Sequence, residues 1–83
     1  MSNLKSFIDR FNAIVDRAIE AGLETPDQEA NLACMKAAAS LQAAQLTCQV
    51  LQLPDIQDPT VIAHVNSSLN ALDTAVTLQI AVS

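Results

Sequence analysis

The chain has few of the residues that build most catalytic and ligand-binding sites. Its 83 residues include one glycine, one histidine and two phenylalanines, and they include neither tryptophan nor tyrosine. A single glycine excludes the glycine-rich phosphate loops of P-loop and Rossmann proteins, because each of those motifs requires two or more glycines. Zinc sites commonly use closely spaced cysteine or histidine pairs, and no such pair occurs here. The sequence therefore predicts no cofactor and no metal ion.

Basic residues are scarce as well. There are four, Lys5, Arg10, Arg17 and Lys36, against nine acidic residues, and the net charge is −5 with a pI near 4.3. Clustered Lys and Arg bind nucleic-acid phosphates and anionic membrane surfaces, so neither nucleic acid nor membrane is an expected partner. No apolar run approaches the roughly 20 residues of a membrane span, and the first residues do not resemble a secretory signal. We therefore expect a cytoplasmic protein.

The second half of the chain has very few charges of either sign. Residues 37–83 carry only Asp55, Asp58 and Asp73 as charged side chains, although their pattern is that of long helices. A helix on the surface of a globular protein normally presents charged and polar residues to water. We therefore expect a second copy of the chain, or another protein, to cover part of these helices.

Apolar residues at intervals of three and four predict an amphipathic first helix over residues 4–21. The apolar residues of this segment are Leu4, Phe7, Ile8, Phe11, Ile14, Val15, Ala18 and Ile19. Gly22 follows at the position where a helix C-terminus favours a left-handed residue. The chain is therefore expected to turn at Gly22.

A second helix is predicted over residues 26–53. Thr25 is a suitable N-cap, and Pro26 suits the first position of a helix because its missing N–H has no intrahelical partner there. Pro54 cannot continue a helix, so we expect the helix to end before it. The second helix is therefore expected to be the longest element of the chain.

A third helix is predicted over residues 59–80, because Asp58 and Pro59 again supply an N-cap and a first-turn proline. Apolar and polar residues alternate over 76–80, which leaves a short strand as the alternative there. The predicted fold class is therefore all-α. We expect a single domain over 1–83, a three-helix bundle that assembles into a homodimer.

The predicted second helix carries two apolar stripes. The first stripe follows the four-three spacing of a coiled-coil seam and consists of Ala30, Cys34, Ala37, Leu41, Ala44, Cys48 and Leu51. The second stripe lies beside it and consists of Leu32, Met35, Ala39, Ala43, Leu46, Val50 and Leu53. This helix is therefore expected to be contacted from two sides.

The first stripe is the predicted protein interface, packed against a second copy or against a target helix. The interface residues expected from this pattern are Ala37, Leu41, Ala44, Cys48, Leu51, Phe7 and Phe11. The favoured role of the two phenylalanines is to anchor the first helix in the core; exposed beside Leu4, they would instead bind a partner, because buried aromatic residues often dominate an interface. Cys34 and Cys48 are too far apart on one helix to form a disulfide. An antiparallel dimer about Leu41 would bring Cys34 near the other copy's Cys48.

The patterns leave three classes of function, of which the third, an enzyme, has almost no support from the residues. The favoured one is a non-enzymatic protein–protein interaction module, acting as an adaptor, inhibitor, chaperone or regulator. The alternative is a structural subunit of a helical assembly or secretion-type filament. No catalytic residue is predicted, because the lone His64 has no spacing that pairs it with a nucleophile. A partner with a basic surface could also bind the acidic first third of the chain, which contains Asp9, Asp16, Glu20, Glu24, Asp27 and Glu29.

Overall fold

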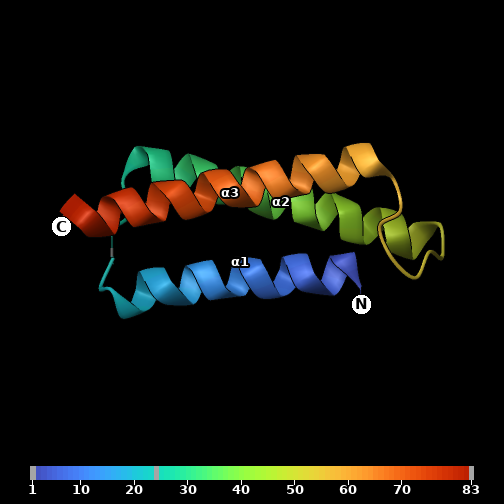
Figure 1. Cartoon of the computed structure of the whole chain (residues 1–83), viewed down its shortest axis with the longest axis horizontal. Coiled ribbons are helices and arrows are strands. Elements are labelled where there is room, and N and C mark those ends of the chain that lie inside the picture. The colour runs from blue at the N-terminus through green and yellow to red at the C-terminus, as the bar shows by residue number, and fades with distance from the viewer. Residues whose placement is uncertain (1, 24, 83) are drawn as a thin grey trace.

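The computed structural model describes residues 2–23 and 25–82. It contains the helices α1 (Asn3–Glu20), α2 (Gln28–Val50) and α3 (Pro59–Val82), and no strand occurs in the described residues. Successive helices run antiparallel, and α1 lies along the α2–α3 pair in a bundle of 43 × 19 × 17 Å (Figure 1). α3 packs against both other helices, and more extensively against α2. The predicted three-helix architecture is confirmed, and residues 76–80 are helical.

The turn after α1 has the predicted geometry. Gly22 adopts a left-handed conformation with φ of 78°. Its N–H donates to the carbonyl of Ile19, and the N–H of Leu23 donates to the carbonyl of Ala18. These two hydrogen bonds form a Schellman motif, which satisfies carbonyls that the end of the helix leaves without a partner.

α2 begins two residues later than predicted. The N-cap is Asp27 rather than Thr25, because the Asp27 carboxylate accepts a hydrogen bond of 2.8 Å from the backbone N–H of Ala30. Pro26 therefore lies just before the cap. A carboxylate at this position also interacts favourably with the positive end of the helix dipole.

α2 also ends three residues earlier than predicted, at Val50. Gln52 is left-handed, with φ of 54°, and the N–H of Leu53 donates to the carbonyl of Cys48 at 2.8 Å. This second Schellman motif contains no glycine. The helix therefore ends at this motif, before the chain reaches Pro54, which was the predicted stop.

α3 begins at Pro59, as predicted. The Asp58 carboxylate caps it by accepting a hydrogen bond of 2.9 Å from the N–H of Thr60. The helix continues to Val82, two residues beyond the predicted end. The predicted start of the third helix at Asp58 and Pro59 is therefore confirmed.

The core is formed by apolar residues of all three helices and by one residue of the α2–α3 connector. Val65, Leu69 and Leu72 of α3 are the largest fully buried side chains. Phe7 and Ile14 of α1 pack against them. The other members of the core cluster are Ala37, Leu41, Ala44, Cys48, Ile56 and Val76. Within the described residues, no polar or charged residue is buried.

The α2–α3 connector holds the start of α1. Asp55 accepts hydrogen bonds of 2.8 Å from the backbone N–H groups of Asn3 and Leu4, and a third of 3.2 Å from the Ser2 hydroxyl. The N–H donors of Asn3 and Leu4 hold the pKa of the Asp55 carboxyl below its ordinary value, because they stabilise the ionised form. Asp55 therefore caps a helix that begins more than fifty residues earlier in the chain.

The opposite end of the bundle is joined in a similar way. The Gln79 side chain accepts a hydrogen bond from the Asp27 N–H at 3.0 Å and donates one to the Thr25 carbonyl at 3.2 Å. α3 thus fixes the α1–α2 connector on either side of Pro26. Glu24, one of the predicted acidic residues, lies outside the described residues.

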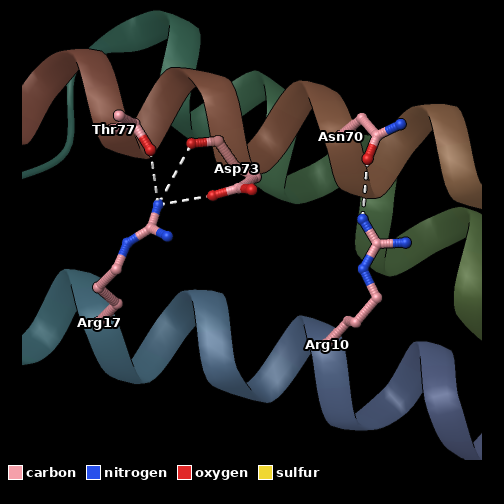
Figure 2. A network of polar contacts seen from close by, with 5 residues as sticks. All are labelled: Arg10, Arg17, Asn70, Asp73 and Thr77. Atoms are coloured by element: carbon pink, nitrogen blue, oxygen red, sulfur yellow. Dashed lines mark hydrogen bonds and ion pairs between the residues drawn. The ribbon is translucent and has the colours of Figure 1, made fainter.

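Two arginines of α1 bind polar side chains of α3 (Figure 2). Arg17 donates to Asp73 at 2.7 Å and to the Thr77 hydroxyl at 2.8 Å. Arg10 donates to the amide oxygens of Asn66 and Asn70, at 2.7 and 2.8 Å. An exposed ion pair such as Arg17–Asp73 contributes only about 0.2–1 kcal/mol. These contacts therefore align α1 on α3 more than they stabilise the bundle.

Candidate functional site

The structure places most of the first stripe inside the bundle. Ala37, Leu41, Ala44 and Cys48 are buried in the chain's own core, while Leu51 is exposed at the end of α2. The buried four contact the rest of the same chain. A partner could reach Ala37 and Leu41 only if the helices separated.

The remaining predicted interface residues belong to α1. Phe7 is buried and Phe11 is half-buried, and both pack in the same core. They therefore anchor α1, which was the favoured interpretation of these two rings. The cysteines are free, with Cys48 buried and Cys34 half-buried. A dimer that joined them across Leu41 would require the bundle to open.

The second stripe of α2 is exposed along its whole length. All seven of its residues are exposed, with Met35 67%, Leu46 50% and Val50 77% accessible. Isolated exposed apolar residues are normal on protein surfaces, but a contiguous apolar surface marks an interaction site. The helix that was predicted to be contacted from two sides is contacted by its own chain on one side only. The second stripe is therefore the candidate functional surface.

The second stripe borders a groove of about 860 Å³ between α2 and α3. Ala39 and Ala43 belong to both features, so the stripe and the groove form one continuous surface. The wall that α2 contributes includes several alanines, whose small side chains leave the groove open on that side. The connector closes one end of the groove with Leu53, Ile56, Gln57 and Asp58.

The wall of the groove that α3 contributes has both polar and apolar side chains. Thr60, Val61, His64 and Ser68 line it, and Ser68 lies 3.4 Å from Ser40 of α2, within hydrogen-bond distance across the floor. Because the helices are antiparallel, this pair sets the register: His64 lies level with Ala44, and Thr60 lies level with Cys48. No residue of α1 is among those that line the groove.

Three titratable side chains other than cysteine line the α2–α3 groove. Lys36 marks the end farthest from the connector, Asp58 lies at the connector end, and His64 lies between them. At neutral pH the two ends therefore carry opposite charges. The acidic residues of α1 and of the start of α2 are absent from the lining.

Two potentially reactive side chains, Cys48 and His64, line the same groove. Cys48 lines the groove from its buried position, while His64 is exposed. Cys34 lines a separate cavity of about 170 Å³ near the other end of the bundle. Across the described ranges, no three His, Cys, Asp or Glu side chains lie close enough together to hold a metal ion.

Both α2 and α3 expose large apolar side chains. Among the described residues, no helix combines the length and the apolar character needed to cross a bilayer. Comparison with protein-family models, curated proteins and solved structures found no match.

Proposed function

We propose that this chain is a small non-enzymatic protein–protein interaction module, acting as an adaptor, inhibitor, chaperone or regulator in the cytoplasm. It binds through the second stripe of α2 and the adjoining α2–α3 groove. The observation that carries the proposal is the exposure of all seven second-stripe residues beside a groove lined mainly by small and apolar side chains. Such a surface suits an apolar helix face, which is a common mode of recognition.

The shape of the groove favours a macromolecular partner over a small ligand. A small-molecule site usually encloses most of its ligand and directs several polar groups at it. This groove is open to solvent and continues into the second stripe. Lys36, His64 and Asp58 are spread along it rather than converging on one point.

Site-specific photo-crosslinking in extracts of the source cells tests the proposal. A photoreactive amino acid at Leu46 should give an adduct of defined mass, whereas the same group at Asn12, exposed on α1, should not. Excess unlabelled wild-type chain should compete for the adduct, and excess Leu46→Asp chain should not. Equal adducts at the two positions, or none at Leu46, would remove the support for this face.

The alternative function, a structural subunit of a helical assembly, is favoured by one observation. Leu51 at the connector end and Val82 near the other end of the bundle are both exposed, 61% and 82%. Apolar residues at both ends of a rod could make head-to-tail contacts, which do not close and therefore continue to grow. A solution mass that rises steadily with concentration, and falls to one chain in Leu51→Asp, would favour this alternative over a closed complex.

A further inference from the structure

We infer that the occupant of the α2–α3 groove is a second copy of this chain, related by a two-fold axis that passes near Ala43. The inference rests on the proposed function, because it uses the same surface, and it adds the identity and orientation of the partner. Three independent features support it: the accessible area of the chain, the distribution of charge along the groove, and the position of the acidic residues.

The chain exposes more surface than its mass requires. Its accessible area is 5533 Å², whereas a folded monomer of this size is expected to expose about 4800 Å². Part of the excess comes from the elongated shape of the bundle. The difference, about 700 Å², approaches the roughly 800 Å² that each partner buries in a standard protein interface. Burying that difference in a pair would leave each copy with about the exposed area expected for its mass.

The charges of the groove are self-complementary. In a two-fold interface, residue i of one copy meets residue j of the other, and j meets i. Lys36 and Asp58 lie at opposite ends of the same groove, so two antiparallel copies bring each Lys36 to the other copy's Asp58. A parallel arrangement would instead place like charges together.

The register of the helices locates the axis. The Ser40–Ser68 contact sets Asp58 level with the end of α2, near Val50. Lys36 lies about 21 Å from that level, at 1.5 Å per residue. The midpoint is Ala43, whose small side chain allows two helices to approach closely.

The same axis matches the apolar residues of the second stripe. Met35 comes level with the other copy's Leu51, and Leu32 comes level with the other copy's Pro54, next to the exposed Leu53. Leu46 comes level with the Ala39–Ser40 segment, where the side chains are small. Large exposed side chains thus meet either another exposed leucine or a gap left by small residues, as well-packed interfaces require.

The acidic residues remain on the outside of this pair. Asp9, Asp16 and Glu20 are exposed on α1, and α1 contributes nothing to the groove. Each copy has a net charge of −5, so a dimer that buried α1 would bring many like charges together. Pairing through α2 and α3 separates those charges by the thickness of two bundles, where salt screens them.

The first experiment is the solution mass of the reduced chain by light scattering over a hundredfold concentration range. The wild type is expected to reach two chains and stay there. Leu46→Asp should give one chain with an unchanged helical circular dichroism signal. Its matched control, Ile19→Asp, replaces an exposed apolar residue of α1 and should remain a dimer. A wild-type monomer at every concentration, or equal behaviour of the two variants, overturns the inference.

The second experiment fixes the orientation by oxidative cross-linking. Ala43→Cys should form a covalent dimer, because the two positions face each other at the axis. Ala38→Cys, exposed on another side of α2, and Met35→Cys, which lies away from the axis, should not. Cross-linking of Met35→Cys to itself would indicate parallel helices and overturn the two-fold arrangement. The wild type, treated in the same way, gives the baseline for Cys34 and Cys48.

The third experiment tests the charge pairs. Lys36→Glu places two acidic groups at each end of the interface and should weaken dimerisation about 2- to 30-fold, as expected for two partly exposed ion pairs. Lys5→Glu, the same change on α1, should leave the dissociation constant unchanged. Equal effects of the two variants would contradict the pairing of Lys36 with Asp58.

These outcomes are distinguishable from failure of the proposed function. If the chain is a monomer and its Leu46 photo-adduct contains a different protein, the proposed interaction function is supported and self-association is ruled out. A dimer with the expected cross-links supports both. A monomer that gives no specific adduct at Leu46 rejects both.

Discussion

The carboxylate of Asp55 accepts a hydrogen bond of 2.8 Å from the backbone N–H of Leu4. The two residues come from opposite ends of the sequence, and the bond ties the α2–α3 connector to the first turn of α1. A helix normally takes its N-cap from the residue just before it, and α1 does have such a cap in Ser2. Asp55 adds acceptors for two further N–H groups that the helix leaves free.

Replacing Asp55 by Asn should lower the thermal unfolding midpoint at pH 7. The pKa of Asp55 is lowered from its ordinary value of 3.8, so its ionised form stabilises the fold. That contribution is fully present above about pH 4 and is lost as the pH falls through the lowered pKa. Unfolding followed by circular dichroism at pH 7 and at pH 2 should therefore show the two proteins converging at low pH. Asp16→Asn, on the exposed side of α1, is the control. A gap as large at pH 2 as at pH 7 would show that the charge is not the cause.

Replacing Gln52 by Gly should stabilise the chain by about 0.5–1 kcal/mol. Gln52 has φ of 54°, a conformation that costs side-chain-bearing residues roughly 1–2 kcal/mol and costs glycine little. Gln49→Gly, inside α2, should instead destabilise by about 1 kcal/mol. Urea denaturation measures both differences. The corresponding loss is expected for Gly22→Ala, since Gly22 has φ of 78°. If Gln52→Gly and Gln49→Gly both stabilised the chain, the cause would be unrelated to the left-handed turn.

Replacing Leu41 by Ala should destabilise the chain by about 2–5 kcal/mol, the usual range for a buried leucine. Leu41 is 6% exposed in the core of a single chain. Leu46→Ala, on the exposed second stripe, should change the stability of the isolated monomer by less than about 0.5 kcal/mol. Urea denaturation at a protein concentration well below the dissociation constant of the dimer compares the two variants. Similar values for the two variants would mean that Leu41 is not part of the monomer core.

The two cysteines should differ in their reaction with a thiol reagent under native conditions. Cys34 is half-buried and Cys48 is buried, so Cys34 should react first and Cys48 only when the bundle opens. In denaturant the two should react at similar rates, which provides the control. The reaction is followed by mass spectrometry of proteolytic fragments. Faster reaction of Cys48 in the folded protein would contradict its burial.

The local features of the fold were predictable because they depend on a few neighbouring residues. Gly22 at the first turn and Asp58 with Pro59 at the start of α3 act within one helical turn. The N-cap of α2 was misplaced because Thr25 and Asp27 are both suitable caps, and Gln79 on α3 holds the connector between them. Gln52 gave no signal, since glutamine rarely adopts a left-handed conformation.

The candidate site was predictable only in part. The sequence shows two apolar stripes on the second helix, but it does not say which one the chain covers with its own α1 and α3. The regular spacing of the first stripe suggested an intermolecular seam, and the structure uses that spacing for its own core. The contacts of Arg10 and Arg17 with α3, like the Asp55 cap, join residues more than fifty positions apart. Such contacts depend on the register of the helices, which spacing alone does not determine.

The odd number of helices places the two ends of the chain at opposite ends of the bundle (Figure 1). A donor dye at Ser2 and an acceptor dye at Val82 would therefore span most of its 43 Å length. Neither position lines the α2–α3 groove, so labels there leave that surface unobstructed. Energy transfer between the dyes would then report detachment of α1 from the other two helices, which would uncover the core residues that α1 covers.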